Sequence, residues 1–495
     1  MRPGEPVRPR LVLLVTMLGL LMVFASTTSV NVALPAVVAA LRPGPGVGDW
    51  FLLSYLLANS VLILVFARLS DVLGRRRLYL AGVAVMTLAS VGCALAQGAG
   101  SLIVWRVLQG VGAAVVLTNS NALVADAFPV ARRAAALGLN VMCASVAGAI
   151  GPALGGVLVQ LFGWQATFLV NVPFGVAAVA LGLAVLPRKR SGGVREGFDV
   201  GGALLSVAAL FLLLFGINRS ATWGAADPRV LGCLATAVLC GGLFVLLERR
   251  LRHPLVDTGL FGDRRRNCGY LAVIALSVPQ TTLPVVLALY EQLVRERSTL
   301  ASGLAIVPFA VVVAVTAPVA GRLVGRLSAH RLTVAGGVLF SAGLALVATY
   351  FALTGPTWLL VVALAVAGLG NGLFHTPNIA ALMAGVPANR YGVATGVRSV
   401  FFNSSQAVGT AVVLLLLGTW FAAAGAPGLT GPLDDPGAVV PGFVAVGALM
   451  VLATLTSSVF SGVARPPRTG TPRLPAPRPA GTSARQSTPQ EADAP

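Results

Sequence analysis

Long apolar segments separated by short polar loops run through almost the whole chain, and they restrict its fold more than any other feature. The stretch between Arg133 and Arg188, for example, contains no charged residue. A helix needs about 20 consecutive apolar residues to cross a bilayer. The sequence therefore predicts an all-α membrane protein.

Fourteen segments meet this length. The first follows a basic stretch and imitates a signal peptide, but its apolar run continues to Pro35 without a convincing cleavage site, so we interpret it as a spanning helix. The fourteen segments lie at about 11–35, 50–69, 78–97, 102–125, 134–161, 167–186, 200–217, 230–247, 269–290, 300–323, 332–352, 358–383, 392–420 and 438–460.

Composition agrees with this class of protein. Hydrophobic residues make up 56% of the chain and charged residues 10%, which is typical of polytopic membrane proteins. The net charge of +19 does not indicate nucleic-acid binding, because the basic residues are scattered between apolar spans. The five cysteines show no metal-ligand spacing. We expect no nucleic-acid partner, no metal and no cofactor.

The basic residues alternate between the two sides of the predicted bundle. If the amino terminus lies inside, the outer loops receive only five of them, which are Arg42, Arg219, Arg229, Arg295 and Arg297. The inner loops receive the arginine runs at 75–77, 132–133, 188–190, 249–252 and 264–266, among others. The positive-inside rule therefore predicts a multi-pass protein of the plasma (inner) membrane with both termini in the cytoplasm.

An internal repeat divides the chain. The loop at 67–77 and the loop at 321–327 both approximate the frame Gly-x-Leu-x-Asp-x-x-Gly-Arg-Arg, although Ala67 replaces a glycine in the first and Gly325 replaces the aspartate in the second. After Ala464 the chain is rich in Pro, Ala, Ser and Thr and cannot bury a core. We expect a cytoplasmic amino terminus at 1–10, a six-helix half at 11–190, an inserted helix pair with its flanking loops at 191–265, a second six-helix half at 266–463 and a disordered cytoplasmic tail at 464–495.

One glycine-rich stretch lies in the fifth apolar segment. Gly148, Gly151, Gly155 and Gly156 expose backbone along a helix, and Pro152 removes a backbone donor, so this helix can pack closely and bend. An ordinary packing face of small residues is the alternative interpretation.

The sequence from Gly151 to Gly156, Gly-Pro-x-x-Gly-Gly, together with the segments 163–168 and 171–175 that follow it, resembles the antiporter motif of the major facilitator superfamily. The resemblance is to the drug:proton antiporter branch with fourteen transmembrane helices, although Ala147 and Gln165 replace a usual Gly and Arg. It implies two six-helix halves with an inserted helix pair.

The resemblance also implies a secondary active efflux transporter. Such a protein exports small hydrophobic compounds, drug-like or antibiotic-like, by alternating access in exchange for protons, and we expect it to work as a monomer in the lipid bilayer. An exporter of a metabolite, an amino acid or a lipid is an alternative on the same scaffold. A membrane sensor or scaffold that transports nothing is a third possibility. We do not expect an enzyme, because the sequence shows no embedded nucleophile–base or metal constellation. The sequence also has no ATP-binding loop of the Gly-x-x-x-x-Gly-Lys-Ser/Thr type, which argues against a primary pump.

Candidate gating residues follow the second segment. Asp71 lies at an inner helix end, where it can pair with Arg75 or with the positive end of a neighbouring helix and so lock the inner gate in one state. Gly74 belongs to the same motif. With Gly151, Pro152, Gly155 and Gly156, these residues form the predicted gating set. A loop that merely obeys the positive-inside rule is the alternative.

Arg106 is the clearest candidate for coupling. A charge at its depth costs about 2.5–3.5 kcal/mol on insertion scales, so it should face a cavity or an internal partner. Gln109 and Gly110 match the superfamily's fourth-helix motif, in which the arginine is implicated in coupling. Snorkelling to the outer boundary is the alternative.

Further polar residues inside the spans complete the predicted coupling and cavity set. His375, Arg398 and Glu291 are titratable or charged, and Asn31 and Asn119 can line a cavity or bond between helices. Glu291 has Arg295 four residues on, which predicts an ordinary helix-end pair. Ser26 stands where the drug:proton branch typically has an acid. We therefore expect a neutral, zwitterionic or anionic substrate, with the proton carried elsewhere, for instance by Glu291, Asp49 or His375.

Overall fold

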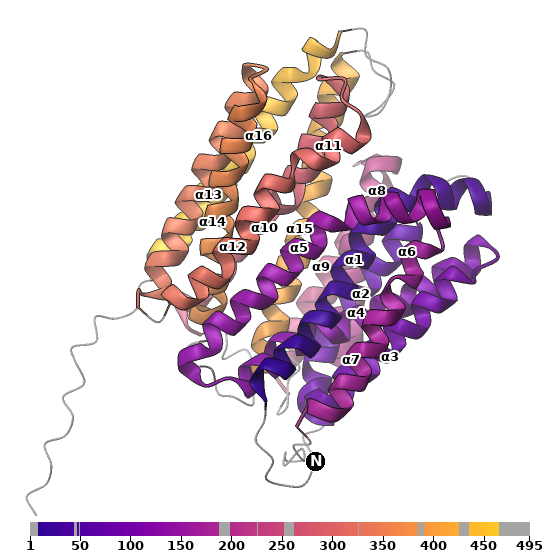
Figure 1. Cartoon of the computed structure of the whole chain (residues 1–495), viewed down its shortest axis with the longest axis vertical. Helices are drawn as coiled ribbons and strands as arrows, with labels where there is room; N and C mark the ends of the chain where they lie inside the picture. The colour runs from indigo at the N-terminus through magenta and orange to yellow at the C-terminus, as the bar shows by residue number, and fades with distance from the viewer. Residues whose placement is uncertain are drawn as a thin grey trace, which may run out of the picture.

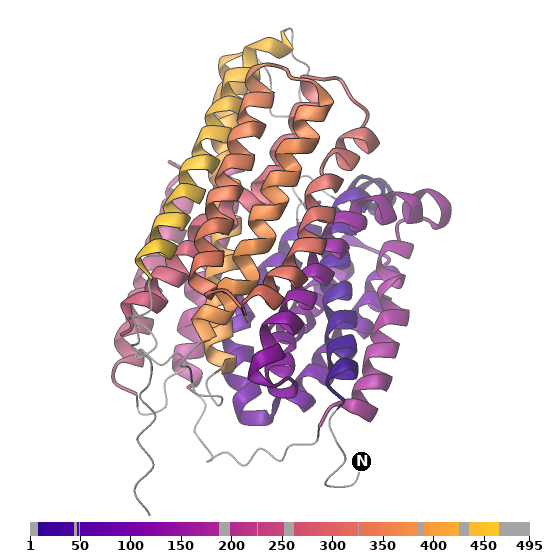
Figure 2. The same ribbon diagram turned by 60° about the vertical axis from the view of Figure 1, so that its left-hand side comes forward.

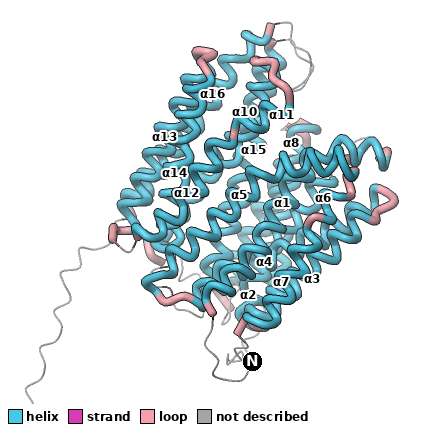
Figure 3. Tube along the Cα trace, viewed as in Figure 1, coloured by secondary structure: helices cyan, strands magenta, loops and turns pink. Residues whose placement is uncertain are grey.

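The computed structural model describes residues 8–43, 47–48, 50–187, 199–224, 226–251, 262–324, 326–383, 386, 391–424 and 435–464. Every regular element in these ranges is a helix (Figure 3), so the predicted all-α class is confirmed. The amino-terminal 1–7, the loop at 188–198 and the tail after Ala464 lie outside the described residues, and the predictions made for them stay predictions.

The helices follow the apolar segments in order. They are α1 Pro9–Leu41, α2 Trp50–Leu73, α3 Arg75–Ala94, α4 Ala99–Ala127, α5 Val130–Phe162, α6 Ala166–Leu169, α7 Asn171–Val185, α8 Val200–Trp223, α9 Pro228–Glu248, α10 Arg264–Leu293, α11 Thr299–Ala305, α12 Val307–Leu323, α13 Ala329–Ala352, α14 Thr357–Met383, α15 Tyr391–Ala423, the 3-10 turn η3 Pro436–Val439 and α16 Val440–Val463.

Within the described ranges, 13 helical stretches are long and apolar enough to cross a membrane. Three of them join two elements, which are α6 with α7, α11 with α12, and η3 with α16. α5 is a helix of 33 residues whose apolar stretch is Ala135–Gly148. With α5 included, the order agrees with the fourteen predicted segments.

Short polar residues fix several helix starts. Asp263 accepts a hydrogen bond from the backbone of Arg265 at 2.9 Å, and Asp199 accepts one from Gly202 at 2.9 Å. Such side chains satisfy backbone donors that have no partner inside the helix. The cap at Asp263 lets α10 begin at Arg264, before the apolar stretch that was predicted to start near 269.

Two helical bodies make up the bundle. Helices α1 to α7 pack on one another, as do α10 to α16, and each body has its own buried core (Figure 1 and Figure 2). Between them in sequence, α8 and α9 pack together, and α8 also contacts α2 of the first half and α15 of the second. The rings of Trp50 of α2 and Phe215 of α8 lie 5.8 Å apart in a tilted arrangement. The arrangement is that of two six-helix halves with an added helix pair.

We call the face of the bundle at which α1 begins and α2 ends the amino-terminal face, and the opposite one the far face; the label N in Figure 1 marks the former. Toward the amino-terminal face, two pairs of small residues bring the halves into contact. Gly138 of α5 meets the backbone of Ala317 of α12, where an added Cβ would lie 2.5 Å from the carbonyl oxygen. Gly396 of α15 packs on the side-chain methyl group of Ala67 of α2, where an added Cβ would overlap it. These contacts place the interface of the halves on α2, α5, α12 and α15.

Candidate functional site

A buried arginine lies in the first half. Arg106 of α4 is 1% exposed, and its Nε–H donates to the carbonyl oxygen of Phe51 at 2.8 Å. Its Nη1 donates to Gln109 Oε1 at 2.6 Å, one turn along the same helix. The guanidinium carbon also lies 4.3 Å from the ring centre of Tyr55 and 5.9 Å from that of Phe168. A carbonyl, an amide and two aromatic faces therefore surround the charge.

Gln109 links Arg106 to Ser26. The Gln109 amide nitrogen donates to Ser90 Oγ at 2.8 Å and lies 3.5 Å from Ser26 Oγ. Asn171 of α7 donates to the same Ser26 hydroxyl at 2.8 Å. We call these five residues, Ser26, Ser90, Arg106, Gln109 and Asn171, the Arg106 cluster.

The cluster brings together three residues that sequence reasoning singled out, Ser26, Arg106 and Gln109. It also contains Ser90 and Asn171, which sequence reasoning missed as site residues. Asn171 stands in the Asn-Val-Pro-Phe-Gly segment that carried the family resemblance, and that was the one available signal. Among the side chains that the structure describes, no acid contacts Arg106, so polar neutral groups alone compensate the charge.

Close backbone packing holds the cluster in place. An added Cβ on Gly110 would lie 2.6 Å from the carbonyl oxygen of Tyr55, so the glycine lets α4 approach α2. On α5, an added Cβ on Gly155 would lie 2.8 Å from the carbonyl oxygen of Ser29, and one on Gly151 would overlap the side chain of Thr28. Two glycines of the antiporter-like stretch thus pack on α1 one turn beyond Ser26.

The other glycines and the proline of the α5 stretch, the remaining gating residues and Asn31 of the cavity set are only partly described. Gly148 has open space around it, and Gly156 and Pro152 continue α5, the side chain of Pro152 lying outside the described residues. Gly74 has a φ of 94°, which a glycine adopts at no steric cost, and it separates α2 from α3. The side chains of Asp71 and Asn31 also lie outside the described residues. Their proposed roles stay predictions.

Arg75 forms an ion pair within the first half. Its Nη1 lies 2.9 Å from Asp126 Oδ2 at the end of α4. The structure shows Asp126 as one partner of Arg75. The predicted pair with Asp71 stays a prediction, because the side chain of Asp71 lies outside the described residues. This pair connects α3 with α4 at the amino-terminal face.

A second buried arginine lies in the second half. Arg398 of α15 is 8% exposed, and its Nη2 lies 3.1 Å from His375 Nδ1 of α14. His375 Nε2 in turn lies 2.7 Å from Gln280 Oε1 of α10. A guanidinium can only donate, so Nδ1 must accept and Nε2 must carry the ring proton. We call Arg398, His375 and Gln280 the His375 relay.

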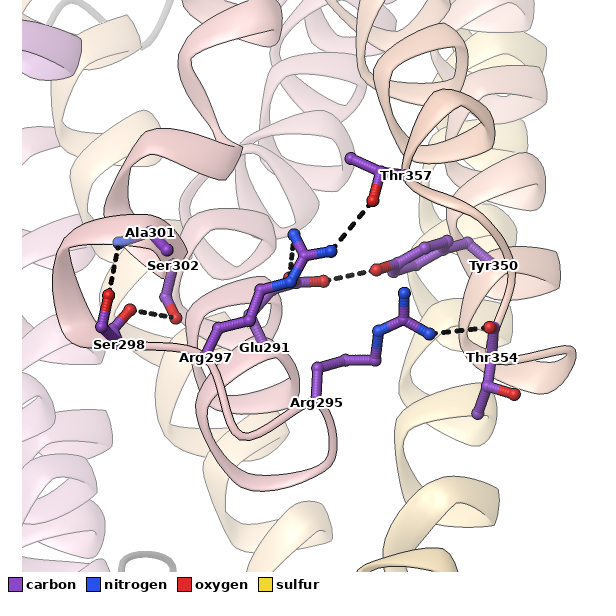
Figure 4. Close-up of polar contacts among 9 residues, drawn as sticks. All are labelled: Glu291, Arg295, Arg297, Ser298, Ala301, Ser302, Tyr350, Thr354 and Thr357. Carbon is purple, nitrogen blue, oxygen red and sulfur yellow. Dashed lines mark hydrogen bonds and ion pairs between the residues drawn. The ribbon is translucent and has the colours of Figure 1, made fainter.

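Glu291 occupies the far-face end of the same half (Figure 4). Its carboxylate is fully buried and accepts a hydrogen bond from Tyr350 Oη at 2.6 Å. Arg297 Nη1 lies 3.0 Å from its second oxygen, and Arg297 Nη2 donates to Thr357 Oγ1 at 2.9 Å. Gln280 and Glu291 are on one helix, about 16 Å apart along its axis at 1.5 Å per residue.

The predicted pair of Glu291 with Arg295 is wrong. The ion pair is with Arg297, whereas Arg295 donates to the carbonyl oxygen of Thr354 at 2.8 Å and lies over the ring of Tyr350. The helix ends at Leu293, and Glu296 adopts a left-handed φ of 52°, which turns the chain back. Helical i,i+4 spacing therefore no longer applies to Arg295.

Asn119 lies in the first half. It is buried, and it donates to Val115 on its own helix at 2.8 Å while its amide oxygen has no hydrogen-bond partner among the described residues. No group of three or more His, Cys, Asp or Glu that could hold a metal occurs in the described ranges. The two buried clusters can bind polar groups or move a proton, and neither has the form of a catalytic centre.

Sequence comparison places these features in a known context. Residues 16–410 and 270–487 match the family model described as Major Facilitator Superfamily. Multidrug resistance protein Stp from Mycobacterium tuberculosis (strain CDC 1551 / Oshkosh) is 35% identical over 427 residues, which cover 86% of this chain and 79% of that protein. Cephamycin export protein CmcT from Amycolatopsis lactamdurans is 34% identical over 463 residues, which cover 90% of this chain and 91% of that protein.

A solved structure has the same fold. The human organic anion transporter MFSD10 (TETRAN) aligns with a TM-score of 0.61 at 16% identity, over 92% of this chain and 100% of that one. At this identity the likeness shows the fold alone.

Proposed function

The chain belongs to the Major Facilitator Superfamily, and on that premise we propose that it exports small hydrophobic compounds by alternating access, in exchange for protons. It is a multi-pass membrane transporter and not an enzyme. Relatives named for multidrug resistance and for cephamycin export support drug-like or antibiotic-like substrates. The amino-terminal face is then the cytoplasmic one, because the positive-inside rule puts both termini there.

The proposal of alternating access rests on the composition of the interface between the halves. Small residues form its closest contacts, with Gly138 against Ala317 and Gly396 against Ala67, whereas the members of each polar cluster come from one half only. Each half can therefore rock as a body without breaking its own polar contacts. Separation of these small-residue contacts opens the cytoplasmic face.

The charges inside the bundle support a substrate without net positive charge. Arg106 and Arg398 are both buried, and neither contacts an acid among the described side chains. Nε of Arg398 and Nδ2 of Asn371 have no hydrogen-bond partner in the described part of the chain, so they can donate to acceptor atoms of a substrate. Neutral, zwitterionic or anionic compounds fit this environment, because a cation would meet like charge.

Transport into everted membrane vesicles tests the proposal. We expect a panel of neutral, zwitterionic and anionic drug-like compounds to accumulate when a pH gradient is imposed, and to accumulate less when a protonophore collapses the gradient. Vesicles from cells without the protein provide the background. Absence of uptake, together with absence of substrate counterflow in proteoliposomes, would show that the protein is a sensor or a scaffold.

A further inference from the structure

The His375 relay lies immediately behind both small-residue contacts between the halves. Arg398 is two residues beyond Gly396, which touches Ala67 of the first half. On α14, Thr376 follows His375 directly, and its hydroxyl donates to the carbonyl oxygen of Ala317 at 3.4 Å. Ala317 is the residue that Gly138 of the first half contacts. A movement of Arg398 or His375 would therefore shift residues that touch the interface of the halves, which are Gly396 on α15 and Thr376 on α14.

We propose that His375 is the site at which the coupling proton binds, and that proton binding there separates His375 from Arg398 and loosens the interface between the halves. The inference rests on the proposed proton-coupled export. It assigns the proton to the second half, because Ser26 in the first half leaves α1 without a carboxylate.

The hydrogen-bond pattern around His375 sets the proton's place. Nε2 already carries a proton toward Gln280 Oε1, so an added proton must go to Nδ1. Nδ1 is the atom that accepts from Arg398 at 3.1 Å. Once protonated, it has no lone pair for the guanidinium, and two positive charges face each other in a poorly solvated place. The contact cannot persist, and α14 and α15 must shift against each other.

The surroundings of His375 contain few other charges. From α15 only Arg398 faces it, and from α10 the titratable neighbour is Tyr270, which interacts with Arg398. The rings of Phe374 and Phe402 pack on the imidazole edge to face at 5.5 and 5.6 Å. The charged residues described on α5, α12 and α13 lie at helix ends at the amino-terminal face, and they are Arg132, Arg133, Arg322, His330 and Arg331. No described carboxylate stands beside the imidazole to hold a second charge.

Glu291, the other buried titratable group of this half, fits the role less well. Arg297 and Tyr350 already occupy its two oxygens. The contacts of these residues run to the far-face start of α14, at Thr357, and not to the interface with the first half. Glu291 is therefore placed to hold the far-face ends of α13 and α14 together.

The test separates proton coupling from transport itself. In proteoliposomes we would measure efflux with and without an imposed pH gradient, and substrate counterflow at equal pH, for the wild-type protein and for His375→Asn. Asparagine offers an amide oxygen near the place of Nδ1, so it can accept from Arg398 but cannot titrate. Ser341→Ala is the matched control, because Ser341 is buried in the same half and bonds to Thr454 outside the relay.

We expect the gradient to raise wild-type efflux about tenfold, within the usual range of coupling between sites. His375→Asn should keep counterflow and lose the gradient response, while Ser341→Ala should keep both. A gradient response retained in His375→Asn would overturn the assignment and leave proton-coupled export intact. If the pH gradient leaves wild-type efflux unchanged, the proposed proton coupling is itself wrong. Loss of counterflow in both His375→Asn and His375→Gln, with normal folding, would assign His375 to substrate binding and overturn the inference.

Discussion

Ser26 of α1 accepts a hydrogen bond from the side-chain amide of Asn171 of α7 at 2.8 Å. The hydroxyl is fully buried, and Gln109 connects it to Arg106. In the drug:proton branch that the sequence resembles, an acid typically stands at this place. A carboxylate at this position would lie next to the side-chain amides of Asn171 and Gln109, and Gln109 would separate it from the buried guanidinium of Arg106.

We expect Ser26→Asp to improve export of monovalent lipophilic cations relative to neutral compounds. An opposite charge in a poorly solvated cavity is worth several kcal/mol if it is well paired. The measurement is the ratio of the two efflux rates at equal expression. Ser26→Asn introduces a side chain with the shape of aspartate but no charge, so it should leave the ratio unchanged.

Two results would contradict this reading of Ser26. One is a wild-type protein that exports cations as strongly as neutral drugs, together with an unchanged ratio in Ser26→Asp. The other is an unchanged ratio with raised thermal stability, which would mean that the new carboxylate pairs with Arg106 instead of meeting substrate.

The sequence predicts most of this fold because each spanning helix is specified locally, by about 20 apolar residues and by flanking charge. Helix ends are less predictable, since they depend on single residues. α1 runs to Leu41, beyond the predicted Pro35, and ends where Arg42 adopts a left-handed φ of 44°. The division into halves was predicted from the loop repeat, and the packing of the helices agrees with it.

The polar sites depend on contacts far apart in sequence, so they were predicted only in part. Arg106 was identified from its depth in a span, whereas its connection to Ser26 through Gln109 needs the packing of α1 on α4. The contact of His375 with Arg398 likewise joins two helices whose registers no sequence pattern fixes. The wrong partner given to Glu291 has a local cause, the turn at Glu296.

The contacts of the α5 glycines predict unequal effects of adding a side chain. Gly155→Val should reduce folded protein and transport, because its Cβ would lie 2.9 Å from the Cα of Ser29. Overpacking of this kind costs about 1–3 kcal/mol. Gly148→Val, on the same helix with nothing within 4 Å, should be nearly neutral. Fluorescence-detected size-exclusion chromatography measures the amount of folded protein, and uptake into vesicles measures transport. Similar losses in the two variants would argue against the α1–α5 contact.

The pairing of Glu291 predicts a non-additive effect on stability. Arg297→Gln should lower the free energy of unfolding by up to about 3 kcal/mol, because it leaves a buried carboxylate unpaired; the side chain of Arg297 is 31% exposed, which limits the loss. Adding Glu291→Gln should recover much of that loss. Arg295→Gln is the matched control and should cost about 1 kcal/mol, the usual worth of one hydrogen bond. Thermal unfolding in detergent measures the cycle, and equal shifts for the Arg295 and Arg297 variants would refute the pairing.

Loop charge predicts the orientation of the chain in the membrane. In a background without the five native cysteines, Ser191→Cys and Ser483→Cys should react with an impermeant thiol reagent only after the cells are opened. Ala226→Cys, in the turn between α8 and α9 at the far face, should react in intact cells and serves as the opposite-side control. Labelling of Ser483→Cys in intact cells would overturn the fourteen-helix topology, because an even number of spans puts both termini on one side.

Two aspartates at the amino-terminal face should behave differently. Asp126 pairs with Arg75 at 2.9 Å and connects α3 with α4, both of which belong to the first half. A pair inside one half persists in every state of the transport cycle. Asp126→Asn should therefore lower stability, by about 1 kcal/mol for a partly exposed pair, with little effect on turnover.

Asp71, at the junction before Gly74, is proposed to close the gate in one state only. Asp71→Asn should leave membrane insertion intact and reduce transport more than substrate binding, since a contact made in one of two states shifts their populations. Binding by the purified protein and efflux at equal expression give the two quantities. Wild-type efflux in Asp71→Asn would show that the aspartate is an ordinary loop residue. A turnover defect in Asp126→Asn as large as that in Asp71→Asn would show that the Arg75 pair itself changes during the cycle.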